Sequence, residues 1–488
     1  MGQAHQRARA VVLSRFDLPD AADLMVSSCE DCACPVSRSE PAVPRFALSP
    51  ADGIRWVPAA GTVESRLDED HRLLFNPLGS YGVVVVNQSA YDVYAGASRG
   101  ADGAEAEDVL RALVGLELIH PDGQPPRPVI APSEVLTAWL HVTNGCNLRC
   151  PYCYIHKSAE AMDESAGRAA VESVFASARA HGFRAVKLKY AGGEASLNHR
   201  LVVTLHEYAT ELAAASGLRL EATLLSNGVR LPEHLARTCQ EAGIRVMISL
   251  DGIGEQHDVQ RPFANGRPSF HLVERTIAEL IDLGCAPHLS VTVTGRNAGG
   301  LSDVVRFALE RDLTFSINLF RDNDCAATAP DLRYEEEEII GSLRAAFEVI
   351  EHSLPRWSVL GSVLDRGQLL QPRQRSCGVG QDYLVIDQRG RVAKCHMEIE
   401  RTLGDVFSDD PLTLVRQDRT SALNLLVEEK EGCRDCTWRY WCSGGCSVAT
   451  FRATGRYDVK SPNCNIYKAI YPDALRLEGL RLLRYARA

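Results

Sequence analysis

The sequence predicts an α/β fold: a partial barrel of six β-α units, preceded by a small winged-helix-like module and followed by a loop-rich, cysteine-bearing extension. Strand-like apolar runs and amphipathic helical runs alternate six times between residues 136 and 352. Parallel strands need crossover helices, so this alternation indicates a parallel sheet. A closed barrel of this type has eight units, so six leave one side open, which would admit a large substrate such as a peptide.

Composition limits the functional classes. The chain has 488 residues, of which 45% are hydrophobic and 24% charged, as in ordinary globular proteins. The net charge of −10, with no large basic block, argues against nucleic acid as a main partner. No apolar run reaches the ~18 residues of a membrane span, and the N-terminus lacks the apolar segment of a signal peptide. We therefore expect a cytoplasmic protein, where 16 cysteines indicate metal or cluster binding rather than disulfides.

The N-terminal part is expected to contain two regions. Residues 1–44 are polar and predict a flexible segment, in which Cys29, Cys32 and Cys34 lack a convincing fourth metal ligand. Residues 45–128 predict a separate small α+β module. Its strands are expected at 72–77 and 81–88, its helix at 89–97, and a further helix and short strand within 107–123. A closing hairpin would complete a winged-helix-like arrangement.

Prolines at 125, 126, 128 and 132 mark a linker before the barrel, which we assign to residues 135–355. The predicted strands are 136–142, 185–191, 218–226, 244–250, 287–294 and 313–319. The predicted helices are 163–181, 198–215, 232–242, 270–283, 300–311 and 334–352. In barrels of this kind the active site lies at the C-terminal ends of the strands, so the loops that follow each strand carry the functional residues.

The loop after the first strand holds Cys146, Cys150 and Cys153 in a C-x3-C-x2-C spacing. Three thiolates can hold three irons of a [4Fe-4S] cluster and leave the fourth iron open, whereas such clusters normally take four cysteines. A structural zinc site is the alternative, with His141 or His156 as its fourth ligand.

With the aromatic Tyr152 before the third cysteine, this loop resembles that of the radical S-adenosylmethionine (SAM) superfamily. The resemblance implies a (β/α)6, TIM-like partial barrel whose three cysteines are the catalytic cluster ligands. It implies that the open iron chelates the amino and carboxylate groups of SAM. The strand-two motif Gly192-Gly193-Glu194 is similar to the family's GGE motif, which hydrogen-bonds SAM's amino group, although the family usually has proline at the position of Ala195.

Polar residues also follow the third and fourth predicted strands. The resemblance implies that residues at these strand ends contact SAM's ribose and carboxylate. The candidates are Ser226, Asn227, Ser249, Asp251 and, about ten residues further, Arg261. Asn-Gly and Asp-Gly pairs are common in simple turns, but their placement at successive strand ends favours the binding interpretation.

Residues 370–470 carry a second cysteine array: Cys377, Cys395, Cys433, Cys436, Cys442, Cys446 and Cys464. The sequence around Gly390 predicts a hairpin that brings Cys395 back toward Cys377. The spacing resembles the SPASM extension of radical SAM enzymes. That resemblance implies one auxiliary [4Fe-4S] cluster on Cys433, Cys436, Cys442 and Cys464, and a second on Cys377, Cys395 and Cys446.

The second set has three thiolates, so a non-cysteine ligand or an open iron would complete it, with Cys325 a remote candidate. A pair of zinc sites is the alternative for the whole array. Residues 471–488 predict a C-terminal helix on the surface of the barrel.

The resemblance, which covers about residues 135–470, implies a radical SAM/SPASM oxidoreductase with three [4Fe-4S] clusters. It would cleave SAM to a 5′-deoxyadenosyl radical that abstracts hydrogen from a residue of a ribosomally made precursor peptide (RiPP maturation), giving a cross-link or other oxidative modification. The expected partners are that peptide and a reductant such as flavodoxin or ferredoxin. The module at 45–128 is similar to PqqD-like leader-peptide domains, which bind a peptide at a sheet edge.

Three alternatives remain open at this point. The first is an anaerobic sulfatase-maturating, formylglycine-forming enzyme, a family that tends to have an acid where this chain has His396. The second is a SPASM enzyme that acts on a small molecule. The third is a non-enzymatic iron–sulfur or zinc protein that binds a partner or senses redox state.

Overall fold

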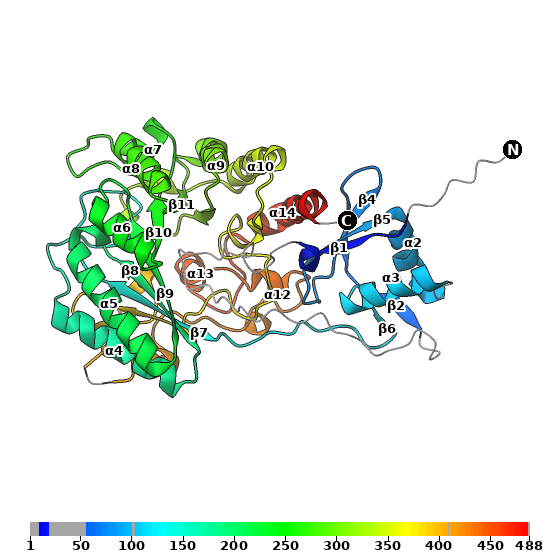
Figure 1. Cartoon of the computed structure of the whole chain (residues 1–488), viewed down its shortest axis with the longest axis horizontal. Helices are drawn as coiled ribbons and strands as arrows, with labels where there is room; N and C mark the ends of the chain where they lie inside the picture. The colour runs from blue at the N-terminus through cyan, green and yellow to red at the C-terminus, as the bar shows by residue number, and fades with distance from the viewer. Residues whose placement is uncertain (1–8, 19–54, 100–102, 408, 487–488) are drawn as a thin grey trace.

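The computed structural model describes residues 9–18, 55–99, 103–407 and 409–486. Its largest sheet has nine strands in the order β12-β11-β10-β9-β8-β7-β13-β14-β15. Strands β7 to β11 of this sheet are labelled in Figure 1. Six parallel strands confirm the predicted partial barrel. They are β7 Val135–His141, β8 Ala185–Ala191, β9 Arg219–Ser226, β10 Arg245–Ser249, β11 His288–Val293 and β12 Phe315–Leu319.

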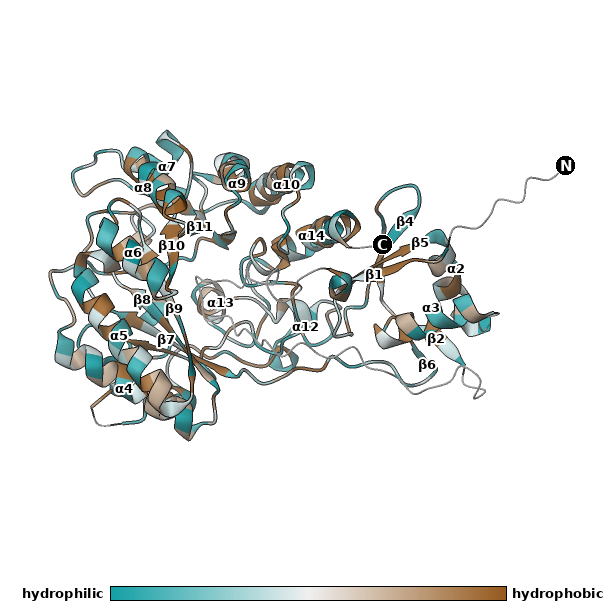
Figure 2. Cartoon of the chain, in the orientation of Figure 1, coloured by the Kyte–Doolittle hydropathy of each residue, from teal (hydrophilic) through white to brown (hydrophobic). Residues whose placement is uncertain are grey.

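Helices cover the outer face of these strands, and Figure 2 shows their mixed apolar and polar surfaces. The barrel helices are α4 Glu164–Ala180, α5 His199–Ser216, α6 Glu233–Glu241, α7 Glu255–Gln260, α8 Phe270–Asp282, α9 Leu301–Glu310 and α10 Glu336–His352. Local chemistry sets the ends: the Asp163 carboxylate accepts from Ala166 N–H at the start of α4, and Gly217 ends α5 in the left-handed region. The six-residue α7 is too short to show a helical period and was not predicted.

Side-chain alternation gives the barrel a polar interior. On β8, Val186, Leu188 and Tyr190 join the main apolar core under the helices. Successive side chains of a strand face opposite ways, so Lys187 and Lys189 lie on the inner face. Strands buried on both faces are usually continuously apolar, so the buried Lys187 and Lys189 set β8 apart from an ordinary core strand.

The C-terminal extension continues the barrel sheet. Strand β13 Tyr383–Ile386 runs parallel to β7, and β14 Arg391–Ala393 pairs with it in an antiparallel hairpin. Gly390 occupies the turn at φ +76°, and its N–H donates to Asp387 O over 3.0 Å. The predicted hairpin is confirmed, and β15 Thr402–Asp405 extends it.

The N-terminal module contains a four-stranded sheet in the order β1-β5-β4-β3, packed against α2 Gln88–Gly96 and α3 Ala104–Gly115. Its strands are β1 Val12–Ser14, β3 Val63–Arg66, β4 His71–Phe75 and β5 Val83–Asn87. Strand β1 lies inside the segment predicted to be flexible, and that prediction is wrong for these residues. Cys29, Cys32 and Cys34 lie outside the described residues.

The predicted closing hairpin of this module is also wrong. Strand β6 Ile119–Pro121 pairs instead with β2 Trp56–Pro58, which lies some sixty residues earlier in the chain. Pairing between strands so far apart depends on the packing of α2 and α3 between them, which no local pattern records.

The last helix, α14 Cys464–Tyr485, begins seven residues before the predicted one, and half of its residues are buried. It lies between α10 of the barrel and strands β4 and β5 of the N-terminal module (Figure 1). Nearby, the fully buried Trp441 donates from Nε1 to Pro77 O over 3.0 Å. The helix is therefore a core element rather than the predicted surface helix. No described helix is long and apolar enough to cross a membrane.

Candidate functional site

The cysteine loop leaves the C-terminal end of β7, and its three thiols are half-buried. Nitrogen donors point at two of the sulfurs: Leu148 N–H donates to Cys146 Sγ at 3.4 Å, and Lys157 Nζ donates to Cys153 Sγ at 2.9 Å. Such donors stabilise anionic sulfur. Burial raises the pKa of Cys150 to about 11, with Arg261 opposing the shift. A bound metal centre would have to displace that proton, as is usual for thiolate ligands.

The two histidines of the zinc alternative have other partners. The His141 ring shares a 2.7 Å hydrogen bond, through Nε2, with Asn144 Oδ1. His156 lies beside Cys325, with ring nitrogens 3.7 and 3.8 Å from its Sγ, and 3.8 Å from the Glu400 carboxylate. In the described part of the chain, no group of three or more His, Cys, Asp or Glu residues could hold a metal ion as the side chains stand.

The Gly-Gly turn after β8 packs directly on the cysteine loop. A Cβ on Gly193 would lie 2.4 Å from Gly145 O, and one on Gly192 would lie 2.5 Å from Thr143 O. Backbone hydrogen bonds join the same segments, from Gly193 N–H to Thr143 O over 2.7 Å. The lack of a side chain at both glycines therefore admits the backbone of the loop that carries the cysteines.

Glu194 links the ends of β8 and β9. Its carboxylate is buried and accepts from Ser226 Oγ at 2.9 Å, from Asn227 N–H at 2.6 Å and from Ser196 N–H at 3.0 Å. The Asn227 amide in turn donates to Asn147 Oδ1, in the cysteine loop, over 2.7 Å. The carboxylate therefore fixes the third strand end relative to the cluster loop.

Tyr152, Asp251 and Arg261 form a compact group at the other side of the loop. The Tyr152 hydroxyl contacts both partners, and Arg261 Nη1 lies 3.3 Å from Asp251 Oδ2. Arg261 Nε is buried and has no acceptor among the described residues. An anion such as a carboxylate would supply one, which fits the expected SAM-binding role. Ser249 ends β10 but makes no hydrogen bond to the cysteine loop in the described structure.

Three residues near the loop were missed from the sequence. Lys157 follows Cys153 by four residues, a spacing that could have drawn attention to it. Asn147 accepts from Asn227, as above. Asn323 follows β12 and donates from Nδ2 to Tyr152 O over 3.0 Å. Asn323 could not have been found, because its contact spans 171 residues of sequence.

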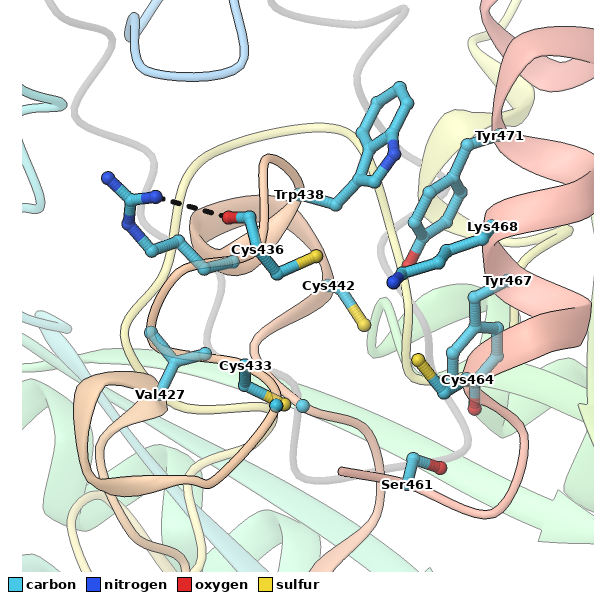
Figure 3. A pocket seen from close by; sticks show the side chains of 13 residues that line it. Val427, Cys433, Cys436, Trp438, Cys442, Ser461, Cys464, Tyr467, Lys468 and Tyr471 are labelled. Carbon is cyan, nitrogen blue, oxygen red and sulfur yellow. Dashed lines mark hydrogen bonds between the residues drawn. The ribbon is translucent and has the colours of Figure 1, made fainter. Parts of the chain in front are cut away.

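The second cysteine array gathers in two places. Cys433, Cys436, Cys442 and Cys464 line one pocket, together with the rings of Trp438, Tyr467 and Tyr471. Figure 3 shows these four thiols around a common space, on the loop before α12 Arg439–Cys442, at its end, and at the start of α14. Burial raises the pKa of Cys433 to about 11. These are the four residues that the SPASM resemblance grouped together.

The other three cysteines lie in a separate apolar cluster. Cys395 is buried there with half-buried Cys377 and Cys446, the latter just before α13 Ser447–Thr454. Burial raises the pKa of Cys395, and the neighbouring Cys446 and Cys377 raise it further. Asn424 Nδ2 lies 3.6 Å from Cys377 Sγ. Cys325 lies with His156 beside the first loop, so the structure gives no support to it as a fourth member of this set.

Comparison with known proteins agrees with this geometry. Residues 140–308 match the Radical SAM superfamily. The chain is 23% identical over 334 residues to a cysteine-type anaerobic sulfatase-maturating enzyme of Clostridium perfringens, covering 62% of this chain and 86% of that protein. It is 24% identical to the antilisterial bacteriocin subtilosin biosynthesis protein AlbA of Bacillus subtilis, covering 62% of this chain and 65% of AlbA.

Among solved structures, that of native anSMEcpe with bound AdoMet and Cp18Cys peptide matches with a TM-score of 0.59. The identity is 20%, and the match covers 71% of this chain and 99% of the other, which shows a shared fold. The chain therefore contains a radical SAM domain, and this family implies a [4Fe-4S] cluster and SAM. The three loop thiols, their N–H donors and the orphaned Arg261 Nε fit both groups.

Proposed function

We propose that this protein, whose residues 140–308 form a radical SAM domain, is a SPASM-type peptide maturase. The observation that carries the proposal is the pairing of two sites. One is the cysteine loop closed against Gly192 and Gly193, and the other is the four-cysteine pocket of Figure 3. A radical SAM enzyme needs only the first, so the second indicates an oxidation that uses auxiliary clusters.

The chain's own residues have distinct roles in this proposal. Cys146, Cys150 and Cys153 would hold the cluster that binds SAM, and the remaining seven site cysteines would hold two auxiliary clusters. When bound, these groups supply a 5′-deoxyadenosyl radical that takes hydrogen from carbon and an acceptor for the second electron. Arg261 would hold SAM's carboxylate through Nε, while Asp251 and Tyr152 keep its guanidinium in place.

The Glu194 carboxylate would accept a hydrogen bond from SAM's ammonium group, and three hydrogen bonds fix its position. An ionised carboxylate has about four lone-pair sites, so one remains for the ligand. Ser226, Asn227 and Ser249 would complete the SAM contacts at the ends of β9 and β10.

The proposed substrate is a precursor peptide. One basis is the N-terminal module, whose edge strand β3 alternates exposed and half-buried side chains and leaves one ladder edge for an added strand. Another is the similarity to AlbA, a bacteriocin biosynthesis protein, and to a fold solved with a bound peptide. We assign residues 45–128 to leader recognition, 135–355 to the barrel and 370–470 to the auxiliary clusters, with a flavodoxin or ferredoxin as reductant in the cytoplasm.

Sulfatase maturation is the second candidate, because the chain covers 86% of such an enzyme. In that family an acid tends to follow the hairpin cysteine. Here His396 takes that place, and its ring nitrogen Nδ1 shares a 2.9 Å hydrogen bond with the Tyr383 hydroxyl. A neutral, buried imidazole cannot supply a carboxylate's charge, which favours the peptide maturase.

The test is anaerobic reconstitution with iron and sulfide, followed by incubation with SAM and a reductant. We expect about twelve irons per chain, four for each cubane, and release of deoxyadenosine. Cys150→Ala should abolish deoxyadenosine formation, whereas Cys285→Ala, half-buried on the barrel surface, should not. Short peptides encoded beside the gene are then the substrates to assay. Cross-linking or oxidation of one of them would support the first candidate, and formylglycine in a sulfatase peptide would support the second.

A further inference from the structure

One flank of the cysteine loop is paired with a tight turn that follows α7. Leu148 forms an antiparallel bridge with Phe263, and Arg149 N–H donates to Pro262 O over 2.9 Å. Gly266, at φ +79°, closes the turn by donating from its N–H to Phe263 O over 2.9 Å. The loop between the first two cysteines is therefore held by a turn whose tip is exposed.

The other flank is formed by the segments that follow β8 and β9. Asn227 is hydrogen-bonded to the cysteine loop, and three residues later the C=O of Arg230 accepts from Ser196 Oγ over 3.3 Å. The residue after this serine, Leu197, is 55% exposed. A Cβ built on Gly145 would lie 3.9 Å from Leu197 Cδ1, so the exposed leucine lies against the cysteine loop.

Three exposed arginines lie on these segments. Arg149 belongs to the cysteine loop itself, Arg267 follows the turn, and Arg230 follows β9. The Arg149 guanidinium donates to Cys146 O over 2.8 Å, and that of Arg267 lies 5.9 Å from the centroid of the Phe263 ring. In the described part of the chain, none of the three arginines forms an ion pair with a carboxylate. Their charges are therefore available to a partner.

Two acids on the adjoining helices already have partners. Asp258 of α7 accepts from Ser269 N–H at 2.6 Å and from Phe270 N–H at 2.8 Å. Glu233 of α6 pairs with Arg237 over 2.7 Å. The chain as a whole carries a net charge of −10, so a basic surface is a local exception. Such a surface attracts an acidic partner and orients it on one face.

The position of this surface limits what the partner can be. Arg149 directly precedes Cys150 in the chain, and its guanidinium is hydrogen-bonded to the backbone of Cys146. A protein seated on Arg149 would therefore contact the loop that carries two of the proposed cluster ligands. Electron transfer slows steeply with distance, so this contact is a short route by which an external electron can reach the first cluster.

We propose that Arg149, Arg230, Arg267 and Leu197 form the docking surface for a small acidic one-electron carrier protein. This inference rests on the proposed function and names the place where its reductant binds. One electron passes from the reduced centre of the carrier to the first cluster, with no bond formed or broken and no proton transferred. Interfaces between electron-transfer partners are small, at about 1,200 Å² or less, and arginine is enriched in protein interfaces.

The test measures binding and electron delivery separately. Reconstituted enzyme is titrated anaerobically into dye-labelled flavodoxin and, in parallel, ferredoxin, and fluorescence anisotropy gives the Kd. Deoxyadenosine formation is then measured with each reduced carrier, and separately with dithionite, a small reductant that needs no docking surface. We expect at least one carrier to bind, with a Kd that rises about tenfold or more between roughly 20 and 300 mM salt, because salt screens exposed charges.

Charge reversal ties binding to the named arginines. The double variant Arg230→Glu and Arg267→Glu should raise the Kd at least tenfold and slow carrier-driven deoxyadenosine formation to a similar extent. Its iron content and its rate with dithionite should stay at wild-type values, which checks folding and cluster loading. The milder pair Arg230→Gln and Arg267→Gln should shift the Kd in the same direction, whereas Arg267→Lys, which keeps the charge, should bind as wild type does.

Arg219→Glu is the matched control, because Arg219 is an exposed arginine at the start of β9, whereas Arg230 follows the end of that strand. An equal rise in Kd from Arg219→Glu would overturn the inference, since the effect would then be one of net charge. Wild-type enzyme that bound neither carrier, or equal Kd values in wild type and the double variant, would overturn it and leave the proposed function standing.

Two further results separate this surface from other roles. A wild-type dimer in sedimentation velocity that the double variant disperses, with no change in the carrier Kd, would overturn the inference, because the surface would then join two copies of this chain. Wild-type enzyme that formed no deoxyadenosine with dithionite would overturn the proposed function and, with it, the electron delivery on which the inference rests.

Discussion

The amine of Lys157 donates a hydrogen bond to the Cys153 thiol over 2.9 Å. Both residues lie in the loop that follows β7, so a half-buried positive charge stands beside one ligand of the proposed SAM cluster. Burial disfavours the charged amine, but the neighbouring Cys153, Cys146 and Cys150 sulfurs outweigh it and raise the pKa of Lys157. The three sulfurs thus stabilise the charged form of Lys157, which donates a hydrogen bond to that of Cys153.

Replacing Lys157 should lower the reduction potential of the first cluster. A charge-assisted hydrogen bond to sulfur stabilises the more negative, reduced state, and such bonds contribute about 1.5–3 kcal/mol. We expect Lys157→Met to lower the midpoint potential by roughly 65–130 mV, since a tenfold change corresponds to 59 mV for one electron. An EPR-monitored redox titration measures this, and Lys157→Arg, which keeps a donor and a charge, should shift it less. An unchanged potential in Lys157→Met would exclude the role.

The Gly193 contact predicts a steric effect. Gly193→Ala would place a Cβ 2.4 Å from Gly145 O, which is backbone and cannot rotate away. Overpacking of this kind costs about 1–3 kcal/mol. We expect lower stability in urea denaturation and loss of iron from the first cluster. Gly299→Ala is the matched control, because a Cβ there meets nothing within 4 Å. Equal iron content in the two variants would contradict the proposed contact.

Glu194→Gln tests the carboxylate that joins the strand ends. Glutamine replaces one carboxylate oxygen with an NH2 group, which donates a hydrogen bond and cannot accept one. If it replaces Oε2 it faces Asn227 N–H, and if it replaces Oε1 it faces the Ser226 hydroxyl and Ser196 N–H, so at least one hydrogen bond is lost. A buried donor left unpaired costs about 1–3 kcal/mol. We expect SAM affinity to fall about tenfold or more in equilibrium dialysis. Glu233 forms an exposed ion pair with Arg237 on α6, so Glu233→Gln should leave SAM affinity unchanged.

The pocket of Figure 3 predicts separable clusters. Cys442→Ala should remove about four of twelve irons, because one cubane loses a ligand. Deoxyadenosine should still form without substrate, since the first cysteine loop is untouched. Iron analysis and chromatography of the reaction check both results. Loss of all iron, or of deoxyadenosine, would show that the two regions do not bind clusters independently.

Asp410 predicts an acid-sensitive link between the extension and the barrel. It caps α11 Pro411–Gln417 and lies 2.7 Å from His181 Nε2 at the end of α4. Burial raises its pKa, but hydrogen bonds from Ser177, Thr413 and His181 outweigh this and lower it to about 2. A pKa below the unfolded value of 3.8 stabilises the fold above about pH 4, and the stability is lost as pH falls toward 2.

This contribution is modest, because a third of the Asp410 side chain is exposed to screening solvent. We expect about 1 kcal/mol at neutral pH, which urea denaturation of the cluster-free protein at pH 6 and pH 3 can resolve. Asp410→Asn should be less stable than wild type at pH 6 and closer to it at pH 3. Asp303→Asn, in an exposed pair, serves as the control. If the difference in free energy of unfolding between Asp410→Asn and wild type were the same at pH 6 and pH 3, the prediction would be contradicted.

The sequence by itself determined the barrel, because the hydrophobic patterns that predict its strands and helices each lie within one short segment. Strand β8 was predicted at residues 185–191, where it is found, and α5 was placed within one residue at each end. The hairpin around Gly390 also followed from adjacent residues. Cysteine spacing grouped Cys433, Cys436, Cys442 and Cys464 correctly in space, since three of them lie within ten residues and their loop has few ways to fold.

Tertiary structure alone decided the contacts between distant segments. Strand β1 pairs with β5 across some seventy residues, and α14 is buried because the N-terminal module covers it. The stacking of His396 on Trp139 joins residues more than 250 positions apart. Hydrophobic periodicity records which face of an element is buried but not which element buries it. The surroundings of the buried His396 are therefore set by packing between units, after each unit's own pattern has been satisfied.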